Sequence, residues 1–456
     1  MDSSPSSHWV RSELSNLESI AKEPLPVQLY SASQTRQLDR CAIDEHQMPG
    51  LDLMKKAGGA AFQLLKQRWP QCERIAVFCG RGNNGGDGYV LARLAHNAGI
   101  EVMLYQVGDT NKLAGDALAL YNECLQDKVP CETYLAKTYL AKTHAGQSLQ
   151  ADVLVDGLLG TGLNSDVGGE YEKAVIAINE SAIPCLALDI PSGLSADTGR
   201  VLGVAVKAEC TITFIACKQG LLTGEGTEYS GELYFDDLGV PAAIYERIPS
   251  EVRRVTLLDL KRLLPSRKKN AHKGSFGHVL VVGGDYGMAG AVIMAAESAM
   301  RCGAGLVSVA THQEHLPLVV ARCPEVMCHS VESDSDMEPL LSKADVIVVG
   351  PGLGRSLWSE ELLNAAMQTS SPVVLDADGL NLLSAGKLEG YGQQARNDNW
   401  ILTPHPGEAA RLLGVDIQAI QEDRFRTARA LQNLYGGAVV LKGPGTIICA
   451  GEDNPK

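Results

Sequence analysis

Phe78 to Ala95 reads FCGRGNNGGDGYVLARLA, in which a glycine-rich run separates an apolar stretch from a segment with helical periodicity. Gly80, Gly82 and Gly85 have the Gly-x-Gly-x-x-Gly spacing by which dinucleotide-binding folds bring a pyrophosphate to a helix N-terminus. Glu101 follows at about the 20-residue separation expected of a ribose-binding acid. One interpretation is therefore a dinucleotide site of the dehydrogenase type.

Asn83, Asn84 and Asp87 favour a different interpretation. They place polar side chains where a dinucleotide fingerprint has small residues, and a carboxylate next to a pyrophosphate repels it unless a cation or several donors intervene. Amide and carboxylate oxygens are ligands for cations. The run thus predicts a loop that binds a cation together with a polar ligand.

Two further strand ends carry oxygen ligands of the same kind. VLVDGLLGTGL contains Asp156 and a glycine turn at residues 160–162, and LALDIPSGLSADTG contains Asp189, Ser192 and Gly193. Each carboxylate alone is equally well explained as a helix cap or a turn residue. Open α/β sheets, however, bind ligands at the carboxyl ends of their strands, so we expect the three loops to converge. Their oxygens suit a hard cation such as K⁺, Na⁺ or Mg²⁺ rather than zinc.

The second half of the chain has its own series of strand-end loops. HKGSFGHVLVVGGDYGMAGA places a strand between a basic glycine loop and a helix start whose amide groups suit phosphate. VVGPGLG, LDADGLN, LTPHPGEAARLLG and LKGPGT follow in that order, each at the end of an apolar run. One such loop is explained by a tight turn alone, whereas five in succession predict a second ligand site.

Short apolar runs bounded by Gly, Pro or Asp must position these loops. Those in the first half lie within residues 74–80, 101–108, 151–160, 183–191 and 209–216, and those in the second half lie within 278–284, 305–311, 344–352, 372–378, 400–408 and 438–446. Their apolar character on both faces predicts buried parallel strands of an α/β fold. The polar, basic segment LLPSRKKNAHKGSFG between the two series is interpreted as a hinge or an active-site loop.

Size and composition limit the class of protein. A chain of 456 residues is too long for one ordinary core, which predicts two domains. Its formal charge of −14 argues against a nucleic-acid partner, and no apolar run reaches the roughly 20 residues of a membrane span. The 12 cysteines form no metal-like Cys-x-x-Cys pair and several lie in apolar runs, which is typical of reduced thiols in a cytoplasmic protein.

GNNGGDG, VDGLLGTGL and LDIPSGL, in this order and at this separation, resemble the N-terminal domain of NAD(P)H-hydrate epimerases, and ITFIACKQGLLTG matches it as well. The resemblance covers about residues 29–240. It implies that Asp189 is catalytic and that K⁺ is bound by Asn84, Asp156 and Ser192. It further implies a substrate site for the hydrated nucleotides NADHX and NADPHX, formed by Asn83, Asn84, Gly85, Gly86, Asp87, Gly160, Thr161, Gly162, Leu163, Asn164, Ser165, Asp166 and Asp189.

The chemistry of such an enzyme suits these residue types. The hydrate carries a hydroxyl at C6 beside the ring nitrogen, so exchange of its R and S forms requires a cationic intermediate and re-addition from the other face. One carboxylate can move the proton and stabilise the positive charge. Because no redox cofactor is consumed, the fingerprint-like glycine spacing then reflects a nucleotide-shaped substrate.

The loops of the second half resemble the ADP/ATP-dependent NAD(P)H-hydrate dehydratases, a branch of the ribokinase-like fold, and the order of the two halves resembles the bifunctional NAD(P)H-hydrate repair enzymes. The resemblance implies that Ala291, Gly354 and His405 line the hydrate site, although His405 alternatively only rigidifies its loop. Phosphate transferred from ADP or ATP with Mg²⁺ to the C6 hydroxyl makes it a good leaving group. The implied adenine-nucleotide contacts are Lys442, Gly443, Pro444, Gly445 and Thr446.

The chain departs from this pattern at its end. The family has a glycine-rich stretch ending in Gly-Asp soon after the Lys-Gly-x-Gly-Thr strand, whereas this sequence stops at ICAGEDNPK. Asp376 and Asp378 follow another strand and are not assigned the role of that aspartate. We therefore expect a dehydratase domain that lacks its C-terminal part and exposes apolar surface, either as a truncated chain or as a domain that binds without turnover.

Together these observations predict an α/β protein of two domains, an N-terminal Rossmann-like three-layer sandwich and an incomplete C-terminal ribokinase-like α/β domain. The expected boundaries are a tail or helix at 1–28, an epimerase domain at 29–250 and a dehydratase domain at 251–456. The predicted function is metabolite repair by a cytoplasmic homo-oligomer that binds neither nucleic acid nor membrane. A ribokinase-like small-molecule kinase and a non-catalytic nucleotide-binding protein are the alternatives.

Overall fold

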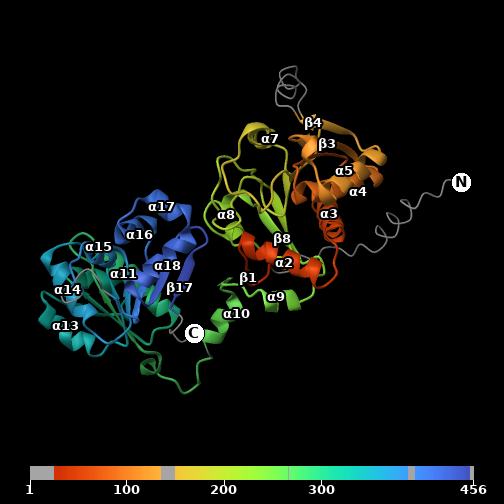
Figure 1. Cartoon of the computed structure of the whole chain (residues 1–456). Coiled ribbons are helices and arrows are strands. Elements are labelled where there is room, and N and C mark those ends of the chain that lie inside the picture. The colour runs from red at the N-terminus through yellow and green to blue at the C-terminus, as the bar shows by residue number, and fades with distance from the viewer. Residues whose placement is uncertain (1–24, 135–148, 265, 389–395, 452–456) are drawn as a thin grey trace. The chain divides into compact units, whose positions relative to one another are not determined.

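The computed structural model describes residues 25–134, 149–264, 266–388 and 396–451. The chain divides into two compact units, residues 1–261 and residues 262–456 (Figure 1). The sequence predicted the boundary between residues 250 and 251, and most of its predicted N-terminal tail, residues 1–24, lies outside the described residues. Within those residues, no helix combines the length and the apolar character needed to cross a membrane.

The first unit is built on a sheet in the order β4-β3-β2-β5-β6-β7-β8, whose described strands all pair in parallel. The strands are β2 Arg74–Cys79, β3 Glu101–Val107, β4 Cys131–Tyr134, β5 Val153–Gly157, β6 Cys185–Leu188, β7 Cys210–Phe214 and β8 Glu232–Asp236. All five apolar runs predicted in this half form strands. The edge strands β4 and β8 were not predicted, because their partly exposed side chains do not form a continuous apolar run. A separate antiparallel pair joins β1 Gln28–Leu29 to β9 Val252–Arg253.

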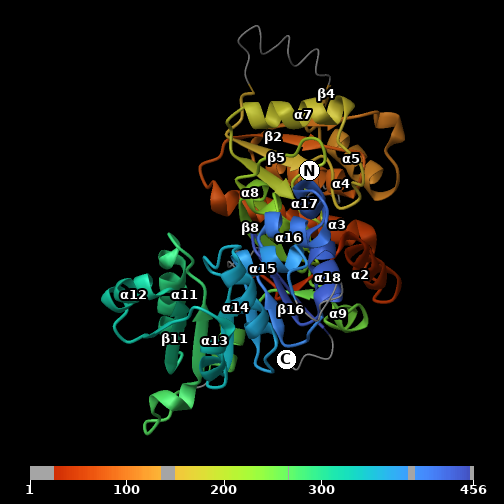
Figure 2. The ribbon, with the colours of Figure 1, turned by 90° about the vertical axis from the view of Figure 1, so that its left-hand side faces the viewer.

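Helices cover both faces of this sheet, which confirms the three-layer prediction (Figure 2). Alternate residues of β2 face opposite layers: Val77 and Cys79 pack with α2 to α5, whereas Ala76 and Phe78 pack with α7. The helices of this unit are α2 Ala32–Asp44, α3 Gly50–Arg68, α4 Asn83–Asn97, α5 Gly115–Gln126, α7 Gly169–Glu180, α8 Gly226–Tyr229 and α9 Ala243–Arg247, with 3₁₀ turns η1 Thr110–Lys112 and η2 Gln219–Leu222. Helix α10 Leu257–Leu263 crosses the boundary between the two units and buries none of its residues.

The glycine run that was interpreted as a loop is the start of a helix, which corrects the sequence analysis. Helix α4 begins at Asn83 and ends at Asn97, shortly before Gly99, where φ is +84°. A methyl group on Gly85 would lie 2.1 Å from the Gly80 carbonyl oxygen, and one on Gly86 would lie 2.1 Å from Met54 Sδ. The glycines therefore allow α4 to approach β2 and α3 closely, and the polar residues between them lie on the first helical turns.

The second unit contains a larger sheet in the order β12-β11-β10-β13-β14-β15-β16-β17, parallel in its described residues except for the last pair. The strands are β10 His278–Val282, β11 Leu306–Thr311, β12 Met327–Ser330, β13 Val346–Val349, β14 Val373–Leu375, β15 Trp400–Leu402, β16 Ala438–Leu441 and β17 Ile447–Ala450. All six apolar runs predicted in this half form strands, whereas β12 and β17 were not predicted. Ile448 on the edge strand β17 is 57% exposed.

Helices also cover both faces of the second sheet. Val281 packs with α11 and α12, whereas its neighbours Leu280 and Val282 pack with the layer that contains α14 and α18. The helices are α11 Ala289–Cys302, α12 Leu316–Arg322, α13 Asp334–Leu341, α14 Leu357–Met367, α15 Ala377–Ser384, α16 Pro406–Leu413, α17 Ile417–Glu422 and α18 Arg424–Tyr435, with 3₁₀ turns η3 Lys273–Phe276 and η4 Gln313–His315. In both units the strand order reverses beside the first long strand, and ligands of open α/β sheets bind at such a point.

Candidate active site

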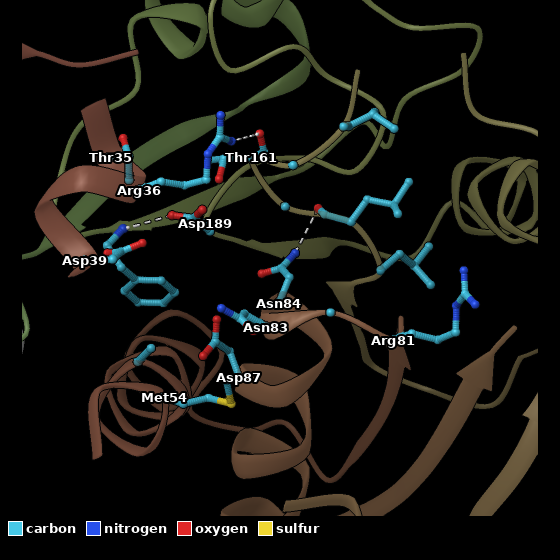
Figure 3. Close-up of a pocket in the computed structure, with 18 of the residues that line it drawn as sticks. Thr35, Arg36, Asp39, Met54, Arg81, Asn83, Asn84, Asp87, Thr161 and Asp189 are labelled. Carbon is cyan, nitrogen blue, oxygen red and sulfur yellow. Dashed lines mark hydrogen bonds between the residues drawn. The ribbon is translucent and has the colours of Figure 1, made fainter. Parts of the chain in front are cut away.

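A cavity of about 820 Å³ opens at the carboxyl ends of β2, β5, β6 and β7 in the first unit (Figure 3). Its size lies within the range of roughly 300–1,000 Å³ that is usual for small-molecule sites. The predicted residues that line it are Asn83, Asn84, Asp87, Gly160, Thr161, Gly162, Leu163, Asn164, Ser165, Asp166 and Asp189. Gly85 and Gly86 are not part of the described lining, because they pack against neighbouring elements instead.

Asp189 is held in a strained backbone conformation at the wall of this cavity. Its φ of +64° is unusual for a residue with a side chain, and its N–H donates to the Ile212 carbonyl oxygen at 2.7 Å. The Asp189 carboxylate forms an ion pair with Lys218 and accepts from the Phe214 N–H at 3.3 Å. The surrounding sheet therefore fixes the position of this carboxylate.

Lys218 was not singled out from the sequence, although it lies within the quoted run ITFIACKQGLLTG. Its side chain is 1% exposed, and its ammonium also donates to Thr213 Oγ1 and to the Phe214 carbonyl oxygen, each at 3.0 Å. A lysine is almost never buried unless it is paired. A lone charged residue directly after an apolar strand was the signal that the sequence analysis missed.

Four further aspartates line the cavity with Asp189, and for two of them, Asp39 and Asp87, the surroundings shift the pKa. Burial raises the pKa of Asp39 to about 6, with Lys218 lowering it and Asp189 raising it. Burial, followed by the charges of Asp189 and Asp39, raises the pKa of Asp87 well above its ordinary value. Three acidic groups thus surround the single buried ammonium of Lys218, and this crowding favours proton exchange among them.

Of the predicted cation ligands, Asn84 lines the cavity, whereas Asp156 and Ser192 are fully buried and are not part of its described lining. Asp156 is fully buried, its Oδ1 accepts from the Ser192 hydroxyl at 2.6 Å and the Leu158 N–H at 3.1 Å, and its Oδ2 accepts from the Ser192 N–H at 2.8 Å. Burial still raises the pKa of Asp156 to about 6, despite these hydrogen bonds. Asn84 donates from Nδ2 to the Leu159 carbonyl oxygen at 3.0 Å, which also accepts from the Ser192 hydroxyl at 3.1 Å.

The donor set at this point fits a monovalent cation. Asn84 Oδ1 is buried without a hydrogen-bond donor, and an unsatisfied buried oxygen is costly unless an ion or a donor meets it. Asp156 supplies a buried carboxylate that is linked to this point through Ser192, whose hydroxyl contacts both Asp156 Oδ1 and the Leu159 carbonyl oxygen. The Ser192 hydroxyl accepts from the Leu159 N–H at 2.8 Å and donates to Asp156, so in this structure it joins Asp156 to the loop after β5.

In the second unit, the predicted residues follow strands that end at one edge of the sheet. Ala291 lies in the first turn of α11, Gly354 follows β13, and the segment 442–446 follows β16. Lys442 Nζ lies 2.6 Å from Asp376 Oδ1, and the Gly354 N–H donates to Asp378 Oδ2 at 3.0 Å. Both aspartates that were set aside in the sequence analysis therefore contact predicted site residues.

His405 lies at the beginning of α16 and caps it. Its Nδ1 accepts from the Gly407 N–H at 3.0 Å and the Glu408 N–H at 3.4 Å, and its Nε2 lies 3.2 Å from Glu408 Oε1. The side chain is nevertheless 50% exposed. The interpretation that His405 rigidifies its loop is thus compatible with these contacts, and half of the ring stays accessible to a ligand.

Asp285, which lies against Gly354, and its partner His312 were not predicted. A methyl group on Gly354, where φ is +74°, would lie 2.4 Å from Asp285 Oδ2. His312 Nε2 lies 3.1 Å from Asp285 Oδ1, and its ring is stacked between Tyr286 at 4.2 Å and Trp358 at 4.0 Å. Sequence reasoning missed the pair because its members follow two different strands.

A buried arginine supports the turn at residues 442–446. Arg424 is fully buried, and its Nη2 donates to the carbonyl oxygens of Leu441 and Lys442, each at 3.3 Å. Gly443 has a φ of +140°, and a methyl group there would lie 2.7 Å from Arg424 Nη1. Thr446 Oγ1 donates back to the Gly443 carbonyl oxygen at 3.2 Å. The turn therefore needs glycine at this position.

These features define a two-domain α/β protein with a nucleotide-sized cavity in its first unit and glycine-rich strand-end loops in its second. Two family models match the chain: the one described as YjeF-related protein N-terminus matches residues 50–220, and the one described as NAD(P)H-hydrate dehydratase matches residues 279–455. The Bifunctional NAD(P)H-hydrate repair enzyme Nnr of Coxiella burnetii is 47% identical over 420 residues, which are 92% of this chain and 83% of that protein. The protein of the same name from Escherichia coli is 40% identical over 440 residues, 94% of this chain and 80% of that protein. The chain belongs to the bifunctional NAD(P)H-hydrate repair enzymes.

A solved structure is also similar to the second half of the chain. It is an ADP/ATP-dependent NAD(P)H-hydrate dehydratase from Bacillus subtilis, co-crystallised with ATP and Mg²⁺. The sequence identity is 28%, the similarity covers 43% of this chain and 68% of that one, and the TM-score is 0.37.

Proposed function

We propose that this chain repairs hydrated NADH and NADPH. Its first unit interconverts the R and S forms of NADHX and NADPHX, and its second unit dehydrates the S form with ADP or ATP. The observation that carries the proposal is the pairing of Asp189 with the buried Lys218 at the wall of a nucleotide-sized cavity, in a chain of this family.

The epimerase chemistry follows from that pair. When the C6–O bond of the hydrate breaks, its electrons leave with the oxygen and positive charge develops on the ring, where the Asp189 carboxylate stabilises it. Lys218 keeps this carboxylate in place because its ammonium is also held by two other acceptors, Thr213 Oγ1 and the Phe214 carbonyl oxygen. Asn83, Asp87 and the loop 160–166 line the remaining wall and would orient the ring and ribose.

We assign the cation site to K⁺. Asn84 Oδ1 and the Asp156 carboxylate would hold the ion, together with the backbone oxygens of the β5 loop. When bound, K⁺ supplies a positive charge that orders this loop and favours an anionic nucleotide. Replacing K⁺ with tetramethylammonium should therefore weaken substrate binding, and indifference to the replacement would remove K⁺ from the proposal.

The dehydratase chemistry is assigned to the carboxyl edge of the second sheet. Residues 442–446 would contact the adenine nucleotide, while Ala291, Gly354 and His405 would line the hydrate site. Phosphoryl transfer to the C6 hydroxyl forms one P–O bond and breaks another in the nucleotide, and loss of the phosphate then restores the dihydropyridine ring. Bound Mg²⁺ would neutralise the phosphate charge during the transfer.

We further propose that the chain forms a homo-oligomer. We also propose that it works in a reducing compartment such as the cytoplasm, on the evidence of its cysteines. All 12 cysteines are free thiols, and most of them are buried. Reduced thiols of this kind are usual in reducing compartments. Sedimentation of the purified chain would test the oligomer directly.

Incubation with mixed R and S hydrates, with and without ADP or ATP, tests both activities at once. Chromatography should show equilibration of the two forms without nucleotide, and consumption of the S form with return of dihydronicotinamide absorbance when nucleotide is present. Asp189→Asn should abolish equilibration but leave dehydration, whereas Asp44→Asn, an exposed change on α2, should affect neither. Wild-type equilibration by the Asp189 variant would refute the assigned role. Nucleotide consumption that does not depend on hydrate would favour the kinase alternative.

A further inference from the structure

Asp39 is an acidic residue of the epimerase cavity that no sequence motif identified. It lies on α2, whose first turn is fixed by a capping box between Ser31 and Gln34 and by an Ala32 N–H bond to Asp197 Oδ1 at 2.6 Å. Figure 3 shows its side chain beside Asp189 and facing the same space. In the described part of the chain, no hydrogen bond or ion pair restrains the Asp39 carboxylate.

Epimerisation requires proton transfer at two positions. The hydroxyl leaves one face of the ring as water, which needs a proton donor on that face. Water must then attack the opposite face and lose a proton there. One group must give a proton to the leaving hydroxyl and one must accept a proton from the attacking water, so two acid–base groups in the cavity suit this reaction.

We infer that Asp39 is a catalytic residue, the second proton-transfer group of the epimerase cavity beside Asp189. The inference rests on the proposed epimerase function and deepens it. In one direction, the protonated Asp39 carboxyl gives its proton to the C6 hydroxyl, and the C6–O bond breaks with its electrons going to the departing water. The ring nitrogen lone pair forms the C=N bond of the cation. Water then bonds to C6 from the other face, its proton passes to Asp189, and the C=N electrons return to nitrogen.

The surroundings of the two carboxylates suit this division of work. Asp189 is held by Lys218 and by the Phe214 N–H, whereas Asp39 has no such restraint and can follow the leaving oxygen. The charged groups that face Asp39 are Lys218 and Arg36, which lower its pKa, Asp189, which raises it, and Asp87, whose own pKa is raised by the charge of Asp39. Burial has the largest effect, and the resulting pKa of about 6 leaves both forms of the carboxyl available near neutral pH.

The experiment compares Asp39→Asn with Asp44→Asn, a control at the exposed end of the same helix. The rate of R and S equilibration is measured from pH 5 to pH 8, together with kcat and KM. Asp39→Asn should lower kcat by roughly 10²–10⁴-fold, the usual contribution of a general acid or base, and should remove the rate change near pH 6. Asp39→Glu should restore part of the rate and of the pH dependence, and Asp44→Asn should match the wild type.

Three results would overturn the inference. They are a wild-type rate for Asp39→Asn, a slow variant that keeps the wild-type pH profile, and a raised KM with unchanged kcat, which would place Asp39 in substrate binding only. Circular dichroism of each variant shows whether the fold is kept. If the wild-type protein itself fails to equilibrate the hydrates, the proposed function fails instead, so the two failures are distinguishable.

Discussion

Alanine substitutions at two adjacent glycines on α3, Gly58 and Gly59, should change the stability of the first unit in opposite directions. Both lie in the interior of the helix, where glycine is about 0.8–1.0 kcal/mol less favourable than alanine. A methyl group on Gly59 has no atom within 4 Å, so Gly59→Ala should stabilise the first unit by most of that free-energy difference. A methyl group on Gly58 would lie 2.4 Å from Val90 Cβ and 2.7 Å from the Asp87 carbonyl oxygen on α4.

The cost at Gly58 is large because neither contacted atom can rotate away. One is the branching carbon of a buried valine and the other belongs to the helix backbone, so α3 and α4 must move apart. Overpacking of this kind costs roughly 1–3 kcal/mol. The two variants should therefore differ in the stability of the first unit by about 1–3 kcal/mol, with Gly58→Ala the less stable. Because α4 carries Asp87, Gly58→Ala should also lower kcat/KM for epimerisation.

Hydrogen exchange followed by mass spectrometry measures this difference in the full chain, since peptides from β2 and α4 report on the first unit alone. Exchange of these peptides should accelerate about tenfold for each 1.4 kcal/mol of lost opening free energy. Gly59→Ala should slow exchange and leave kcat/KM unchanged. Equal exchange in the two variants would show that α3 and α4 are not packed as closely as the geometry requires.

Three other changes have definite expected outcomes. His405→Ala should destabilise α16 by about 1 kcal/mol through loss of its cap, whereas His405→Asn should keep the cap. If both variants slow dehydration equally, the imidazole ring contacts the substrate, because only one of them loses the cap. Arg424→Met should cost roughly 1–3 kcal/mol in the second unit, because the carbonyl groups of Leu441 and Lys442 lose their donor, and it should weaken ATP binding in calorimetry. Asp39 holds its proton more tightly in the folded protein, so between its ordinary pKa of 3.8 and about 6 the stability of the first unit should fall as pH rises. Asp39→Asn should remove this fall. Its free energy of unfolding, measured in melting experiments, should exceed that of the wild type by roughly 1–3 kcal/mol at pH 7 and should equal it at pH 4.

The strands could be predicted because buried parallel strands are apolar on both faces, and that signal is local. All 11 runs that the sequence analysis named form strands. The edge strands β4, β8, β12 and β17 were missed because a partly solvated edge does not need a continuous apolar run. The start of α4 was misplaced because glycine and asparagine have low helix propensity, which the close packing of α3 and β2 overrides.

The site was predictable only where its residues fall in contiguous motifs. The residues at 83–87 and 160–166 form two short runs in the sequence, and most of them line one cavity. Lys218 was hidden in an apolar run, and its importance depends on Asp189, which lies 29 positions away. Asp285 and His312 are 27 positions apart and meet only because β10 and β11 are neighbours in the sheet.

The order of apolar runs and glycine-rich turns was by itself enough to determine an α/β protein of two domains and its resemblance to a family, because strand burial and turn geometry depend on residues close together in the chain. Only the tertiary structure decided which acids lie near Lys218, that Asn84 Oδ1 stays buried without a donor at the cavity, and which helix brings Asp39 to it. Those properties depend on burial and on distances between separate elements, and neither quantity can be read from spacing along the chain.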